Sequence, residues 1–142
     1  MNNLLIKGYN GSVEIEVSRY ERPEAKDPSD ANWLSTTVDV RVGPFTGHYA
    51  ATLTTYDFAA FRTELEALLA GKIVKAVFAG DEGWLRLEIT IGPCGSGKVN
   101  GEASCNQGVK SKLSFSFETD QTFMAETLRS LMIIVKTFPV KG

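Results

Sequence analysis

The sequence predicts an α+β fold, in which an antiparallel β-sheet of about eight strands carries two helices packed on one face. Several short segments alternate apolar and polar residues, which is typical of strands with one buried and one solvated face. Two longer segments carry apolar residues at helical spacing, and each follows an Asp that can cap a helix. The 142 residues, 43% hydrophobic and 23% charged, are expected to form a single domain over 1–142.

The first half of the chain is expected to hold three strands and one helix. Residues 11–19 and 34–42 alternate, and Gly43-Pro44 then breaks the chain before a third alternating run. The second and third runs therefore read as a hairpin. Asp57 is expected to cap the helix, and Gly71 is expected to end it, because glycine suits the left-handed conformation that follows a helix.

The second half repeats this order. Four strands are expected, near residues 73–79, 85–91, 99–105 and 113–118. A turn is expected from Gly80 to Gly83, and Asp120 caps a second helix that ends at Phe138-Pro139. Two interpretations stay open: the chain consists of two ββα-like halves produced by duplication, or it uses a common strand–Asp–helix arrangement twice.

Charge and apolar runs exclude several classes of protein. The net charge is −2 and the basic residues are scattered, which disfavours nucleic-acid binding, because nucleic-acid binders concentrate Lys and Arg against phosphates. No apolar run approaches the roughly 20 residues of a membrane span, and Leu4-Leu5-Ile6 is too short for a signal peptide. Cys94 and Cys105 are expected to lie more than ~20 Å apart as free thiols, which fits a cytoplasmic protein.

The residues that suggest catalysis have simpler interpretations. The run from Gly92 to Lys98 fits the phosphate-loop spacing G-x-x-x-x-G-K, but Val99 follows where a Ser or Thr and a helix are needed, so a hairpin turn is predicted. His48 is the only histidine, which excludes a zinc site built on two histidines, and it is expected to be a solvated strand residue. No catalytic residue, metal site or cofactor is predicted, and the chain is not expected to be an enzyme.

The polar strand faces supply candidates for binding a partner protein. Glu14 and Glu16 lie roughly 7 Å apart on one face, a spacing that suits paired glycosidase carboxylates but that any exposed charged strand also shows. Trp84 has the parity of the polar face, where it would anchor a partner; the alternative is that it folds over the sheet edge. The predicted partner-binding residues are Glu14, Glu16, Asp39, Trp84, Arg86 and Glu88. A second acidic candidate is the exposed loop expected over residues 21–32, with Glu21, Glu24, Asp27 and Asp30.

The second helix is apolar all round between Leu131 and Val135. A helix that covers one face of a sheet is expected to keep a polar stripe. Either neighbouring elements cover both sides of this segment, or a homodimer forms through Leu131, Ile133 and Ile134.

Several short motifs occur in a definite order along the chain. They are Asn32-Trp33-Leu34, Gly43 to Gly47 (GPFTG), Asp57 to Phe61 (DFAAF), Gly83-Trp84-Leu85, Asp120-Gln121-Thr122 and Phe138 to Gly142 (FPVKG). In this order they resemble the WapI-type bacterial immunity proteins, which neutralise a contact-dependent, wall-associated toxin. The resemblance implies a non-catalytic cytoplasmic protein that binds a cognate toxin domain, and it transfers no functional residue. The alternative function is an interaction or scaffold module, homodimeric and without a toxin partner.

Overall fold

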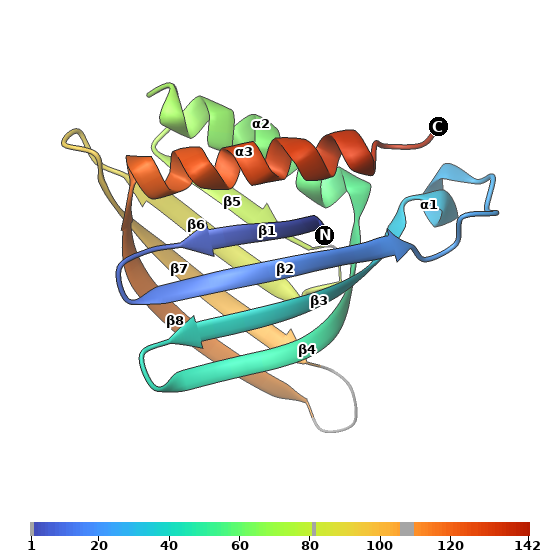
Figure 1. The fold of residues 1–142 in the computed structure, drawn as a ribbon, viewed down its shortest axis with the longest axis horizontal. Helices are drawn as coiled ribbons and strands as arrows, with labels where there is room; N and C mark the ends of the chain where they lie inside the picture. The colour runs from blue at the N-terminus through green and yellow to red at the C-terminus, as the bar shows by residue number, and fades with distance from the viewer. Residues whose placement is uncertain (1, 81, 106–109) are drawn as a thin grey trace.

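The computed structural model describes residues 2–80, 82–105 and 110–142, which form eight strands and three helices (Figure 1). Four strands make one antiparallel sheet, called sheet A, in the order β1 (Asn2–Lys7), β2 (Gly11–Tyr20), β3 (Trp33–Val42) and β4 (Phe45–Thr54). The others make sheet B, also antiparallel, in the order β5 (Lys75–Ala79), β6 (Leu85–Ile91), β7 (Ser96–Cys105) and β8 (Ser111–Asp120). The helices are α1 (Pro28–Ala31), α2 (Thr55–Leu69) and α3 (Gln121–Thr137).

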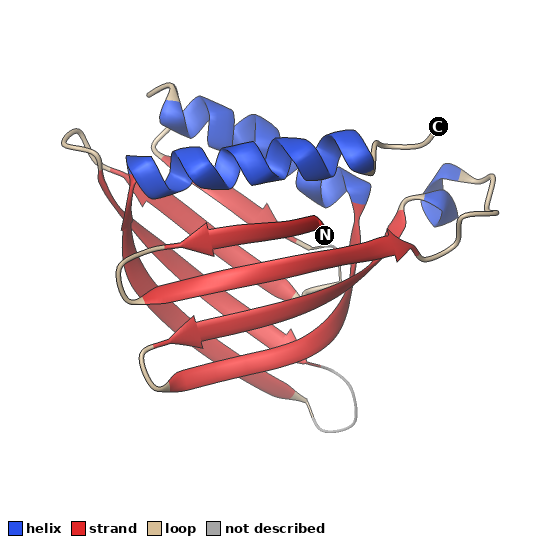
Figure 2. Cartoon of the chain, viewed as in Figure 1, coloured by secondary structure: helices blue, strands red, loops and turns tan. Residues whose placement is uncertain are grey.

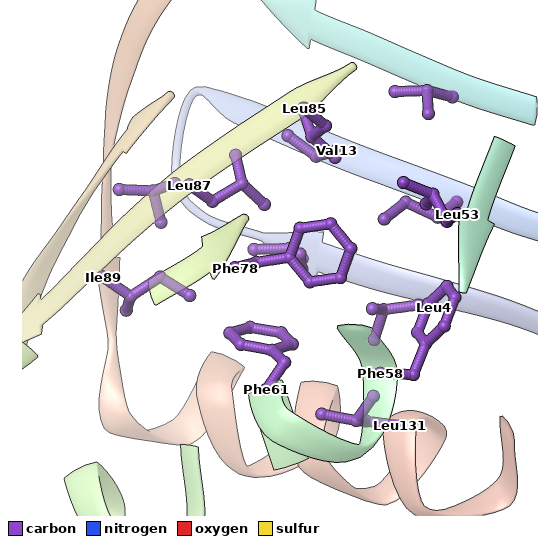
Figure 3. Packing of buried hydrophobic residues seen from close by; sticks show 14 of the residues in the cluster. Leu4, Val13, Leu53, Phe58, Phe61, Phe78, Leu85, Leu87, Ile89 and Leu131 are labelled. Carbon is purple, nitrogen blue, oxygen red and sulfur yellow. The ribbon is translucent and has the colours of Figure 1, made fainter. Parts of the chain in front are cut away.

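The two sheets face each other and share one hydrophobic core. Alternation gives each strand one apolar row, and Val13 and Ile15 in sheet A and Leu85 and Leu87 in sheet B are all fully buried. Figure 3 shows side chains from both sheets and both long helices meeting in this cluster. Burying one such side chain contributes about 1.5–3 kcal/mol, so the opposed apolar faces hold the sheets together.

The long helices lie together on one side of this sandwich (Figure 2). Helix α3 runs along β1 and α2 runs along β5, so each helix covers the edge strand of a sheet. Phe58 and Phe61 of α2 pack edge-to-face on Phe78 of β5, with ring centroids 5.7 and 5.5 Å apart. Strand β4 is the edge strand of sheet A on the side away from the helices (Figure 1).

Side chains of the helices hydrogen-bond to the edges of β1 and β5. The Thr127 hydroxyl of α3 donates to the Leu5 carbonyl of β1 at 2.9 Å. In the other half of the chain, the Val77 amide of β5 donates to the Glu64 carboxylate of α2 at 3.0 Å. Each half is therefore a four-stranded sheet followed by a helix that packs on the first strand of the other half.

The predicted α+β class, the total of about eight strands and the two long helices are confirmed, and the arrangement differs from the expectation in two respects. The strands are divided between two facing sheets, so the apolar face of each sheet is covered largely by the other sheet. The repeated unit is four strands and a helix instead of ββα. Alternation along a strand identifies its apolar face but not the element that covers this face, which explains the difference.

The helix ends follow the predicted chemistry with one correction. Thr54, instead of Asp57, is the N-cap of α2: its hydroxyl accepts from the Asp57 amide at 3.2 Å, and the Asp57 carboxylate accepts from the Thr54 amide at 2.8 Å. This reciprocal pair is a capping box. Asp120 caps α3 as predicted, accepting from the Phe123 amide at 2.9 Å, and Gly71 follows α2 with a φ of +75°.

Some local structure was not predicted. Strand β1 was missed because the apolar Leu5 interrupts its alternation, and this side chain is 41% exposed. Helix α1 lies in the expected loop, where the Asp27 carboxylate accepts from the Ser29 amide at 3.0 Å. The run from Gly92 to Lys98 contains the predicted turn between β6 and β7, but β7 begins at Ser96, earlier than the expected start near residue 99. Asp81, in the expected turn between β5 and β6, lies outside the described residues, and these strands pair antiparallel.

Candidate partner-binding surfaces

The outer face of sheet A carries three of the predicted contact residues side by side. Glu14 of β2 lies directly opposite Asp39 of β3, and Glu16 lies two residues further along β2 on the same face. We call Glu14, Glu16 and Asp39 the acidic cluster. All three are half-buried, and the Asn3 side-chain amide donates to the Glu14 carboxylate at 2.8 Å. The Glu14 carboxylate is therefore held in place by the neighbouring strand β1.

Basic neighbours partly offset the negative charge of the acidic cluster. The Arg41 guanidinium lies 3.5 Å from the Asp39 carboxylate, and the His48 imidazole lies 4.0 Å from it. The side chains of Arg41 and His48 are 71% and 73% exposed, so water and salt screen both pairs strongly. The prediction that His48 is a solvated strand residue is confirmed.

On the outer face of sheet B, acidic side chains form ion pairs with basic neighbours. Glu88 accepts from Lys75 at 3.0 Å and from Arg86 at 3.1 Å. These hydrogen bonds hold the pKa of Glu88 below its ordinary value, and the bond from Lys75 has the largest effect. Glu102 pairs with Lys112 at 2.9 Å, and the same face has a hollow of about 330 Å³. Both of these carboxylates are therefore paired with basic side chains, whereas on sheet A the ion pairs involve only Asp39 of the acidic cluster among the described residues.

The structure does not unite the six predicted contact residues in one surface. Because the sheets face each other, their outer faces point in opposite directions (Figure 1). Arg86 and Glu88 therefore lie on the face opposite the acidic cluster.

Trp84 lies just before β6 and bridges the two sheets. Its ring is half-buried and stacks on Tyr49 of β4, with centroids 6.4 Å apart and planes 23° apart. Its carbonyl accepts from the Tyr49 hydroxyl at 2.6 Å. This geometry fits a residue that folds over the sheet edge and joins the sheets, which was the alternative to an exposed anchor.

Helix α3 requires a correction to the predicted dimer contact. Leu131 and Ile134 are 0% and 1% exposed, since they face the core shared with β1 and α2, and they are not available to a second subunit. Ile133 and Met132 are 60% and 42% exposed. Neighbouring elements therefore cover one side of this apolar segment, and a homodimer through Ile133 stays a prediction.

A hollow beside β4 was not predicted from the sequence. It measures about 260 Å³ and lies between β4 and the adjoining ends of β7 and β8; its lining includes Gly47, Tyr49, Ala103, Cys105 and Leu113. Burial raises the pKa of the Tyr49 hydroxyl far above its ordinary value. The sequence signal is Gly47, which stands at an inward position of an alternating strand where a side chain is expected.

Within residues 2–80, 82–105 and 110–142, no three His, Cys, Asp or Glu side chains are grouped so that they could hold a metal ion. In the same ranges, no helix has the length and apolar character needed to span a bilayer.

Comparisons with solved structures return weak similarities. The MRP1/MRP2 structure from Trypanosoma brucei is 14% identical, with 87% of this chain and 84% of that chain covered and a TM-score of 0.44. A guide-RNA-binding protein complex bound to a guide RNA is 13% identical, with coverages of 96% and 86% and a TM-score of 0.48. The plant transcriptional regulator PBF-2 is 12% identical, with coverages of 99% and 89% and a TM-score of 0.44. Matches this distant carry no inference about function.

The comparison with protein families gives a different result. No curated protein sequence matches this chain significantly. The family described as immunity protein WapI-like, however, matches residues 4–139, which include every strand from β2 to β8, most of β1 and all three helices. This match spans both halves of the chain and contains the acidic cluster and the hollow beside β4. The chain belongs to the WapI-like immunity protein family.

Proposed function

We propose that this protein binds and neutralises a cognate toxin domain in the cytoplasm, and that it acts by occupying the toxin instead of by catalysis. The observation that supports the proposal is the family match over residues 4–139. An inhibitor of this kind needs a rigid surface that matches its target, and two sheets that share one core provide rigid outer faces.

The acidic cluster is the proposed charged contact. Its carboxylates are partly desolvated on adjacent strands, and among the described residues their ion-pair partners occur only at Asp39. A basic patch on the toxin would gain from these charges, mainly through faster association. Arg86 and Glu88 are a weaker candidate, because Glu88 already has two basic partners.

Co-expression with the toxin domain encoded beside this gene tests the proposal. The wild-type protein is expected to restore growth and to co-purify with the toxin, whereas an unrelated toxin of similar size is expected to remain lethal and unbound. Continued killing by the adjacent toxin, together with no complex in titration calorimetry, would contradict the proposal.

The paired substitution Glu14→Gln and Asp39→Asn tests the acidic cluster. It keeps the shape of both side chains and one accepting oxygen in each but removes two charges, and we expect the association rate at low salt to fall about tenfold. The matched control is Glu102→Gln with Glu88→Gln on sheet B, which is expected to leave this rate nearly unchanged. Equal effects of the two pairs in stopped-flow mixing would rule out a specific role for the acidic cluster.

A further inference from the structure

Among the described residues, no strand pairs with the outer edge of β4, where every second residue directs its backbone groups away from β3. Val42 and Phe45 flank the two-residue turn at Gly43-Pro44, and residues that close such a turn form a hydrogen-bonded pair. Hydrogen-bonded and non-bonded pairs alternate along an antiparallel ladder. The residues whose N–H and C=O groups point away from β3 are therefore Thr46, His48, Ala50 and Thr52.

The end of the strand agrees with this assignment. Thr54 has the same parity as these four residues, and its amide donates to the Asp57 carboxylate instead of to β3. Within residues 2–80, 82–105 and 110–142, no hydrogen bond joins the outward backbone groups of Thr46, His48, Ala50 and Thr52 to another residue. By contrast, helices cover the edges of β1 and β5 through Thr127 and Glu64. Within the part of the chain that the structure describes, no helix covers the edge of β4, although Trp84 lies beside it near Ala50 and Thr52.

The hollow of about 260 Å³ lies directly beneath this edge. Gly47 and Tyr49 of β4 form its wall on sheet A, and Ala103 and Leu113 form its wall on sheet B. A strand added beside β4 would continue sheet A, and its inward side chains would point between the sheets, as those of β4 do. The hollow thus offers space for an apolar side chain at the position where an added strand would place one.

We propose that β4 binds an extended segment of the cognate toxin domain as a fifth strand of sheet A, with one apolar side chain of that segment in the hollow. The inference rests on the proposed function, because it takes the toxin as the partner. Backbone hydrogen bonds at Thr46, His48, Ala50 and Thr52, spaced about 6.8 Å apart along the strand, would supply affinity. The hollow would select an apolar residue at one position of the toxin segment, and the acidic cluster on the adjacent strands would favour basic residues nearby.

A comparison of His48→Pro with His48→Ala isolates the backbone contact. Both variants lose the imidazole, but only proline loses the outward N–H, and proline is tolerated at solvent-facing positions of edge strands. We expect His48→Pro to raise the Kd for the toxin domain about tenfold relative to His48→Ala, as the loss of one well-placed hydrogen bond and the obstruction of its neighbours would produce.

A second variant tests the hollow without touching the backbone groups. A Cβ added at Gly47 would meet the Leu113 side chain at 3.8 Å, an ordinary contact distance, so Gly47→Val is expected to fold and to fill the hollow. We expect about tenfold weaker toxin binding with no loss of thermal stability. Ala50→Val, which places its methyl groups on the outer face of the same strand, is the matched control and is expected to bind like wild type.

Hydrogen exchange of the complex gives a readout that any other docking mode would not produce. Toxin binding is expected to slow exchange at the outward amides of Thr46, His48, Ala50 and Thr52, whereas the amides between them are already bonded to β3. Equal toxin affinity of His48→Pro and His48→Ala, with no alternating protection, would overturn strand addition and leave the proposed function standing. A wild-type protein that binds no toxin would overturn both. Pairing of β4 between two copies, shown by a dimer that His48→Pro dissociates while toxin binding persists, would also overturn the inference.

Discussion

Asn32 is a buried polar residue whose side chain holds the end of the chain in place. It is 1% exposed. Its amide donates to the carbonyls of Pro28 and Lys141 at 2.8 and 3.0 Å, and its oxygen accepts from the Lys141 amide and the Thr55 hydroxyl at 2.7 and 2.6 Å. One side chain therefore joins α1, the start of α2 and the segment after α3. Two motifs that stand far apart in the sequence, at Asn32 and at Phe138 to Gly142, meet here.

Asn32→Ala is expected to lower the free energy of unfolding by about 2–3 kcal/mol, because the buried Thr55 hydroxyl and the backbone groups of Pro28 and Lys141 lose their partner. The amide of Lys141 is expected to exchange faster with solvent. Asn10→Ala is the control, since Asn10 is exposed and contributes its backbone carbonyl to Gly43. Denaturant titration and hydrogen exchange measure both effects, and equal stabilities of the two variants would contradict the role given to Asn32.

Tyr9 and Asp120 link the turn between β1 and β2 to the start of α3. The Tyr9 hydroxyl donates to the Asp120 carboxylate, which also accepts from the Phe123 amide. These hydrogen bonds hold the pKa of Asp120 below its ordinary value of 3.8, and the bond from Tyr9 has the largest effect. A carboxyl group with a lowered folded-state pKa stabilises the protein above its unfolded-state pKa, and this stabilisation is lost as the pH falls through the folded-state pKa.

Tyr9→Phe is therefore expected to be less stable than wild type at neutral pH, with a gap that narrows as the pH drops below 3.8. The ring contact with Phe123, edge-to-face at 5.2 Å, is available to either residue, so the comparison isolates the hydroxyl. Thermal melting of both proteins from pH 7 to pH 2 checks the expectation. A gap of constant size over this range would show that the hydroxyl does not act through Asp120.

At the scale of elements, the sequence predicted what local chemistry controls. Alternation identified β2, β3 and β8 because their polar faces are solvated. The start of α3 was predicted at Asp120, but the start of α2 was placed at Asp57, because Thr54 looks like a strand residue until its hydroxyl is seen to accept from the helix. Strand β1 was missed because Leu5 is apolar on the solvated side.

Thr54→Ala tests the capping box of α2. We expect a loss of about 1 kcal/mol, the usual cost of removing an N-cap hydroxyl. Thr63→Ala in the middle of the same helix is the control, since its exposed hydroxyl bonds only to the carbonyl four residues earlier. Chemical denaturation compares the two variants. If both variants lose the same stability, the cap contributes nothing specific.

At the scale of the whole molecule, the sequence again predicted the parts of the candidate sites that depend on local pattern and missed those that depend on how the sheets pack. Glu14 and Glu16 were placed on one face by the period of a single strand, and the pairing of β2 with β3 then brought Asp39 beside them. The separation of Arg86 and Glu88 from this cluster, and the hollow under β4, depend on how two sheets face each other. The alternation within one strand does not predict that arrangement, because it does not identify the sheet that packs against the strand.

The exchange of helices between the halves leads to a final prediction. Helix α3 of the second half covers β1 of the first, and α2 of the first half covers β5 of the second. A fragment of residues 1–73 therefore lacks both the opposing sheet and the helix on its edge strand, and so does 74–142. Each would expose the apolar face of a four-stranded sheet, which costs about 25 cal/mol for each Å² left in water.

Neither fragment is expected to melt cooperatively alone, whereas an equimolar mixture is expected to regain a cooperative transition and dispersed amide spectra. The cut falls beside Val74, which is 81% exposed, so the break itself disturbs little packing. A circularly permuted chain of full length, with its new ends at this position, is the matched control, because it has the same cut in one molecule. If a lone fragment folds cooperatively, the halves are independent units and the contacts of α2 and α3 across them are not needed to hold either sheet together.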